Sequence, residues 1–174
     1  SDFAEMNEIR LLFGRPAIHD KMELISAIRH LQLHYGCIVQ ALDADKVVSK
    51  EHLLFATKKA ISAFNQRRNI AKDVGMEILR YASGERQIDR ALNMGVSDRT
   101  ERIALILTSW GSKCSWPDED DLTRLLEPDG LGCSCRYDAV KEAFNITSAE
   151  LEAVGEDRIE DLVIERVALA DTYR

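Results

Sequence analysis

The feature that most constrains the fold is an uninterrupted apolar run in the second half of the chain, Ile103-Ala104-Leu105-Ile106-Leu107. Charged residues precede it, and Trp110-Gly111 follows shortly after it. A strand with one solvated face would alternate apolar and polar residues, so this run predicts a strand that is buried on both faces. Other elements must then cover the sheet on each side.

Two further segments have the composition of strands, residues 8–13 and 37–42. The first ends at Gly14 and Pro16, residue types that commonly end a strand. Helical periodicity between a capping residue and a terminating residue predicts the other elements. With their caps, these helices are 20–36, 49–68, 73–84, 86–94, 117–126, 136–144, 148–153 and 156–171.

This order of elements predicts an α+β (mixed α/β) fold, in which a small central sheet is flanked by helices. The chain has 174 residues, and a chain of this length buries roughly two-thirds of its unfolded surface without metal or disulfide support. It contains no internal repeat and no long linker. We therefore expect residues 1–174 to form one helix-rich domain.

Charge is distributed unevenly along the sequence. Residues 46–102 contain 12 Lys+Arg and 7 Asp+Glu, a net of +5, although the whole chain has a net charge of −7. Residues 1–45 contribute 4 − 7 = −3, and residues 103–174 contribute 7 − 16 = −9. A basic middle third within an acidic chain indicates a surface for a polyanion, although helical surfaces are often basic for solubility alone.

The sequence has neither a long apolar run nor the basic start of a signal peptide, so we expect a cytoplasmic protein without membrane contact. It also lacks a P-loop, a dinucleotide-binding glycine motif, a zincin motif and a nucleophile elbow. His30 and His34 are four residues apart, but no third ligand accompanies them. These absences favour a binding protein over an enzyme, with no cofactor and no metal.

One alternative is a small cytosolic metal- or thiol-dependent enzyme that uses Cys133 and Cys135 with the carboxylates of Asp118 to Asp121. A single C-x-C pair lacks the spacing of a structural zinc site, and free thiols or a disulfide to Cys114 are the other readings. The carboxylates directly follow Pro117, where negative charge complements the start of a helix. We interpret them as helix-start residues.

The helix that begins at Ser49 carries the most informative surface. Its apolar face holds Leu53 and Ile61, whereas Phe55, Lys58 and Lys59 belong to the polar side. An aromatic ring beside lysines can stack on an unpaired base while the ammonium groups meet phosphates. The competing interpretation is that the ring packs beneath a neighbouring part of the same chain.

Arg86 and Arg90, four residues apart on the next short helix, would add a second row of cations, or would pair with Glu85 and Asp89. The last helix, residues 156–171, has an apolar arc wider than the ~100° that docking on one core requires. It is therefore deeply buried or partly available to a partner. For a partner surface, we expect the off-axis residues Ile164 and Leu169 to take part.

Several segments, taken in order, resemble the small kinase-associated, tRNA-binding subunit of the KEOPS complex (the PRPK-binding protein family), in its archaeal type. The resemblance covers residues 9–170, except for 113–136, which it does not match. It rests on Ser49-Lys-Glu-His52-Leu, Ala56, Ala60, Ala63, Glu77 to Gly84, Arg86-Gln87-Ile88, Ala91-Leu92, Gly95, Phe144 to Leu151 and Val163 to Leu169.

The resemblance implies a non-catalytic subunit of the machinery that installs threonylcarbamoyladenosine in tRNA. Such a subunit binds and stimulates a small atypical kinase/ATPase, recruits tRNA through its single-stranded 3′ CCA end, and associates only indirectly with the threonylcarbamoyltransferase subunit. The basic middle third and the missing catalytic motifs agree with this role.

Overall fold

The computed structural model describes residues 8–111 and 114–172 and has the expected mixed α+β fold. Its four described strands form one antiparallel sheet in the order β2-β3-β1-β4. They are β1 (Ile9–Pro16), β2 (Ile38–Asp43), β3 (Ile103–Thr108) and β4 (Leu126–Pro128). Strand β2 therefore lies at one edge of this sheet.

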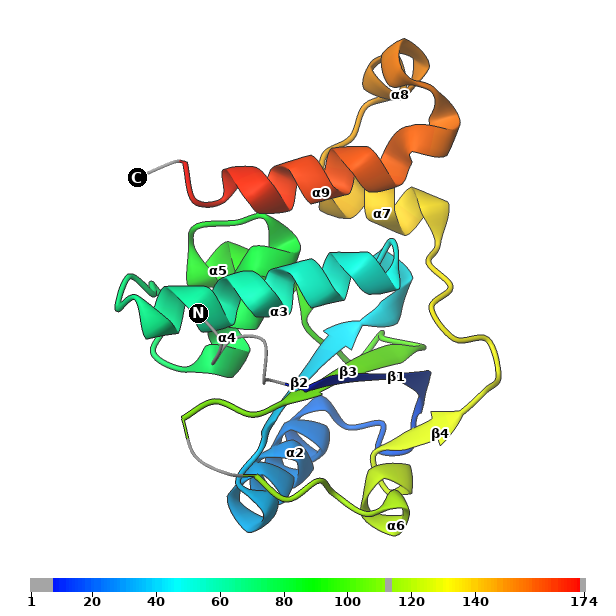
Figure 1. The fold of residues 1–174 in the computed structure, drawn as a ribbon. Helices are drawn as coiled ribbons and strands as arrows, with labels where there is room; N and C mark the ends of the chain where they lie inside the picture. Colours follow the sequence, from blue (N-terminus) through cyan, green and yellow to red (C-terminus); the bar gives the residue numbers. More distant parts are fainter. Residues whose placement is uncertain (1–7, 112–113, 173–174) are drawn as a thin grey trace.

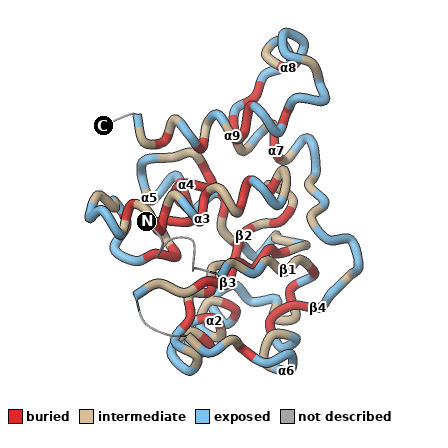
Figure 2. Tube along the Cα trace, viewed as in Figure 1, coloured by how far each residue is buried: buried red, intermediate tan, exposed pale blue. Residues whose placement is uncertain are grey.

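All residues of β3 are buried, as the uninterrupted apolar run predicts (Figure 2). Its alternate side chains enter two separate hydrophobic clusters. Ile103, Leu105 and Leu107 join the cluster of helix α2 (Lys21–Tyr35), whereas Ala104 and Ile106 join the larger cluster on the other face. The sheet is thus covered on both sides (Figure 1).

Helices α3 (Lys50–Asn65) and α4 (Val74–Ser83) cover the second face, and α9 (Ile159–Leu169) packs on both of them (Figure 1). The shorter helices are α5 (Ile88–Ala91), α6 (Glu119–Thr123), α7 (Tyr137–Ala143) and α8 (Ser148–Val154). Turns of 3-10 helix occur at η1 (Ala44–Lys46), η2 (Leu92–Met94) and η3 (Glu156–Arg158).

The predicted helix caps are confirmed. The side chains of Asp20, Ser49 and Asp73 each accept a hydrogen bond from the backbone N–H three residues further on. Gly36 and Gly84 end α2 and α4 with φ values of 70°, a conformation that glycine adopts without strain. The helix predicted over 86–94 is shorter, because its second half is the 3-10 turn η2.

Two predicted boundaries near the sheet are wrong. Strand β1 does not end at Gly14 but continues to Pro16, and the helix predicted over 117–126 ends at Thr123. The chain then turns into β4, which pairs with the end of β1. A Cβ atom at Gly14 would lie 2.2 Å from the carbonyl oxygen of Glu127, so this close approach requires glycine.

Within the described residues, we find no helix with both the length and the apolar character needed to span a membrane.

Candidate nucleic-acid interface

Polar side chains from α3, from the segment after it and from α4 meet around Asp171, just beyond the end of α9. The Lys59 ammonium of α3 lies 2.7 Å from one carboxylate oxygen of Asp171, and Arg68 Nη1 lies 3.2 Å from the other. The Tyr81 hydroxyl of α4 donates a hydrogen bond to the same carboxylate. Although burial acts to raise the pKa of Asp171, the hydrogen bonds from Lys59 and Tyr81 bring that pKa below its ordinary value.

A pocket of about 280 Å³ opens beside this carboxylate. Arg68, Arg80 and Arg86 contribute its cationic lining, together with Ile70, Tyr81, Ala170 and Asp171. Arg80 is buried, and its Nε atom lies 2.8 Å from the carboxylate of buried Glu77. We call Lys59, Arg68, Arg80, Arg86 and Tyr81, with their carboxylates Glu77 and Asp171, the basic cluster. The basic cluster thus contains four cationic and two anionic side chains.

Phe55 lies next to the basic cluster but is less available than the sequence suggests. Its ring is half-buried and packs against the larger core. The Lys59 ammonium lies 5.3 Å from the centroid of the Phe55 ring and 5.6 Å from that of Tyr81. Lys59 is therefore held by two aromatic rings and one carboxylate, and only part of the Phe55 ring can offer a stacking surface.

The four predicted cationic contacts divide into two groups. Lys59 and Arg86 belong to the basic cluster, whereas exposed Lys58 on α3 and exposed Arg90 on α5 lie outside its pocket lining. The predicted contacts did not include Arg68, Tyr81 or Asp171. Arg68 and Tyr81 lie within the basic middle third, which was a usable signal, but nothing in the spacing of Asp171 connects it with them.

The residues named for the alternative enzyme function have structural roles. Asp118 caps α6 by accepting a hydrogen bond from the Asp121 backbone N–H, which confirms the helix-start interpretation. Cys133 and Cys135 are partly buried against the larger core, and burial raises the pKa of Cys133 to about 11. A thiol with so high a pKa stays protonated near neutral pH and is a weak nucleophile. No three His, Cys, Asp or Glu side chains of the described segments are grouped as metal ligands.

The last helix is buried along one side and open along the other. Leu162, Val163 and Val167 of α9 are buried, which accounts for much of the wide apolar arc. Ile164 and Leu169, the residues expected to meet a partner, are half-buried. Each therefore keeps some apolar surface at the border of the packed face.

Comparison with protein families gives one match, which covers most of the chain. Residues 17–171 fit the model of the family described as kinase binding protein CGI-121. No curated protein shows significant similarity to the sequence.

Proposed function

The chain belongs to the CGI-121 family of kinase-binding proteins, and from this premise we propose that it is the tRNA-recruiting subunit of a KEOPS complex. It binds and stimulates a small atypical kinase/ATPase in the cytoplasm, has no catalytic activity of its own, and reaches the threonylcarbamoyltransferase subunit only indirectly. The observation that carries the tRNA part of the proposal is the basic middle third of an acidic protein. It supplies the basic cluster, with its aromatic rings, and the exposed cations Lys58 and Arg90.

A single-stranded 3′ end suits such a surface because its phosphates and its unstacked bases are both accessible. Lys58, Arg86 and Arg90 supply charge for phosphates, and Lys59 joins that charge to the ring of Phe55. The acidic remainder of the chain repels nucleic acid elsewhere and so restricts binding to this face.

We propose that the kinase contacts α9 through Ile164 and Leu169. Their half-buried side chains adjoin the buried row of this helix, so a partner can cover the apolar surface that the fold leaves open. The interaction needs no catalytic group of this chain.

Co-purification with the cognate kinase tests this surface. Ile164→Glu and Leu169→Glu should each lower kinase binding at least about 30-fold, because a hot-spot residue contributes ~2 kcal/mol or more. Leu131→Glu is the matched control, since Leu131 is an exposed leucine outside α9. Thermal unfolding of each variant shows whether it is folded. Folded glutamate variants that bind the kinase as tightly as the unchanged chain would contradict the α9 surface.

A further inference from the structure

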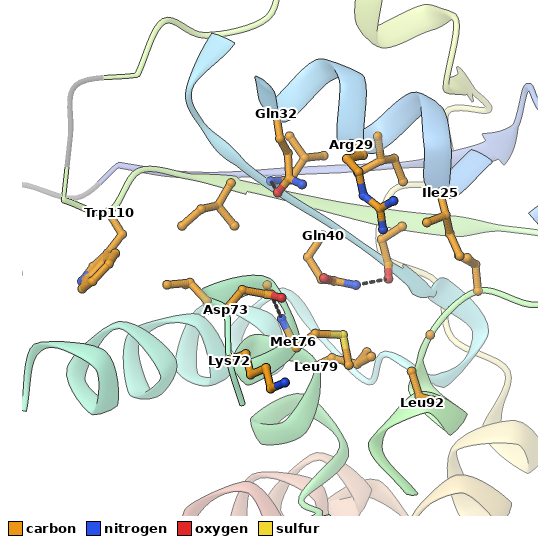
Figure 3. A pocket seen from close by; sticks show the side chains of 18 of the residues that line it. Ile25, Arg29, Gln32, Gln40, Lys72, Asp73, Met76, Leu79, Leu92 and Trp110 are labelled. Carbon is orange, nitrogen blue, oxygen red and sulfur yellow. Dashed lines mark hydrogen bonds between the residues drawn. The ribbon is translucent and has the colours of Figure 1, made fainter. Parts of the chain in front are cut away.

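A groove of about 620 Å³ lies on a different part of the molecule, along the free edge of the sheet (Figure 3). Helix α2 and helix α4 form its two walls, and β2 lies between them. Ile25 lines one wall, Met76 and Leu79 the other, and Leu92 and Trp110 lie towards the ends. The groove thus offers apolar surface next to an unpaired strand edge.

Backbone hydrogen-bonding groups on the free edge of β2 point toward the groove. In an antiparallel pair, backbone groups point alternately toward and away from the partner strand. The Val39 N–H points away from β3, because it donates to Gln32 Oε1 of α2 at 3.0 Å. By the alternation, the Val39 carbonyl and both backbone groups of Ala41 point the same way.

Side-chain amides occupy two of these four positions. Gln32 accepts from Val39, and Gln40 Nε2 donates to the Ala41 carbonyl at 3.0 Å (Figure 3). Gly75 leaves room for the Gln40 side chain, because a Cβ atom there would lie 2.7 Å from Gln40 Oε1. Two glutamines therefore take the place that the backbone of a neighbouring strand would fill.

The charges around the groove define the occupant. Lys21, Arg29 and Lys72 line it, whereas Asp73 is its acidic lining residue and already accepts the Met76 backbone N–H to cap α4. Acidic residues on an incoming segment would be attracted to these cations. A second copy of this chain would instead bring the same three cations toward them, which disfavours pairing of two β2 edges.

We propose that an extended, acidic segment of the partner kinase pairs with β2 as a fifth strand and replaces the Gln32 and Gln40 amides. Its backbone bonds to Val39 and Ala41, its apolar side chains fill the groove, and its carboxylates meet Arg29 and Lys72. This inference rests on the proposed kinase partner. It adds a second kinase contact, made by an extended segment, to the contact on α9. Either of these two proposed contacts can be disproved while the other stands.

Proline at position 41 tests the backbone contact directly. Ala41→Pro removes the outward N–H, and an edge strand tolerates proline where that N–H faces away from the sheet. We expect kinase binding to weaken roughly tenfold through loss of one backbone hydrogen bond and obstruction of the edge. Ala41→Val is the matched control, because it adds similar bulk but keeps the N–H, and it should bind at least several-fold more tightly than Ala41→Pro.

Hydrogen exchange supplies a readout that requires no substitution. In the complex of the full chain with the cognate kinase, exchange of the Ala41 amide should slow at least about tenfold, because it gains a backbone partner.

Charge reversal tests the cations of the groove. The Arg29→Glu/Lys72→Glu variant should bind the kinase several-fold more weakly, and its binding should depend less steeply on salt concentration. Arg15→Glu/Arg99→Glu makes the same charge change at exposed residues outside the groove and should bind as the unchanged chain does.

The outcomes separate the two proposals. If the unchanged chain does not bind the kinase, the proposed function fails. If the kinase binds but Ala41 exchange does not slow and the groove variants bind normally, the fifth strand is wrong and the glutamines only protect the edge from aggregation. Should Ala41→Pro not fold, the exchange measurement and the charge reversals decide the question.

Discussion

His52 shows how one residue can connect two helices on the second face of the sheet. Its ring is fully buried, Nδ1 accepts the Val48 backbone N–H at 3.2 Å, and Nε2 lies 2.7 Å from the Ala82 carbonyl oxygen of α4. Nδ1 as acceptor leaves the proton on Nε2, so the neutral imidazole satisfies both partners. Burial lowers the pKa of His52 to about 4.

Acidification should therefore destabilise the protein through His52. Between the unfolded pKa of 6.5 and the folded pKa of about 4, the unfolded chain binds a proton that the folded chain excludes. The free energy of unfolding should fall by up to about 3 kcal/mol across that range. Denaturant unfolding of the unchanged chain and of His52→Gln at several pH values checks this. Equal pH dependence of the two proteins would show that His52 is not responsible.

At the scale of elements, the strongest sequence signals gave correct predictions. The uninterrupted run in β3 predicted burial on both faces, and side-chain caps located the starts of α2, α3 and α4. Strand β4 escaped prediction because it has three residues, of which one is buried, so no periodicity exists to detect. The available signal was Gly14 within the β1 strand, since a strand glycine often marks a close backbone approach.

Gly14→Ala should separate β4 from β1. The added methyl group would lie 2.2 Å from the Glu127 carbonyl oxygen, which is backbone and cannot simply rotate away. We expect a loss of about 1–3 kcal/mol in the free energy of unfolding, the usual cost of overpacking. Hydrogen exchange should show the loss concentrated at the amides of residues 14, 15, 126 and 127, because positions 16 and 128 are prolines without an N–H. A variant as stable as the unchanged chain, with protected β4 amides, would contradict the observed pairing.

At the scale of the whole molecule, the basic cluster joins residues that are distant in sequence. Lys59, Arg68 and Arg86 belong to the basic middle third, but Asp171 reaches them only because α9 packs across α3 and α4 (Figure 1). Charge counting could therefore indicate a nucleic-acid surface, whereas it could not reveal the carboxylate that holds Lys59. This carboxylate also decides which lysine suits mutagenesis.

Lys58 is the better residue for charge reversal. A glutamate at position 59 would face the Asp171 carboxylate and destabilise the packing of α9, so reduced tRNA binding would be ambiguous. Lys58 and Arg90 are exposed, and their reversal leaves the basic cluster intact. Arg15→Glu is the matched control, because Arg15 is exposed but lies outside the basic middle third.

Phe55→Ala should cost about 1–3 kcal/mol in tRNA binding without changing the salt slope if a base stacks there.

The central claim, tRNA recruitment through the 3′ CCA end, is tested most directly by filter binding of one tRNA with and without that end across a salt series. We predict tighter binding of the intact tRNA. Lys58→Glu and Arg90→Glu should each weaken it and lower the salt slope by roughly 0.7, whereas Arg15→Glu should leave both unchanged. Equal affinity for the two tRNAs, unaffected by the reversals at Lys58 and Arg90, would contradict the claim.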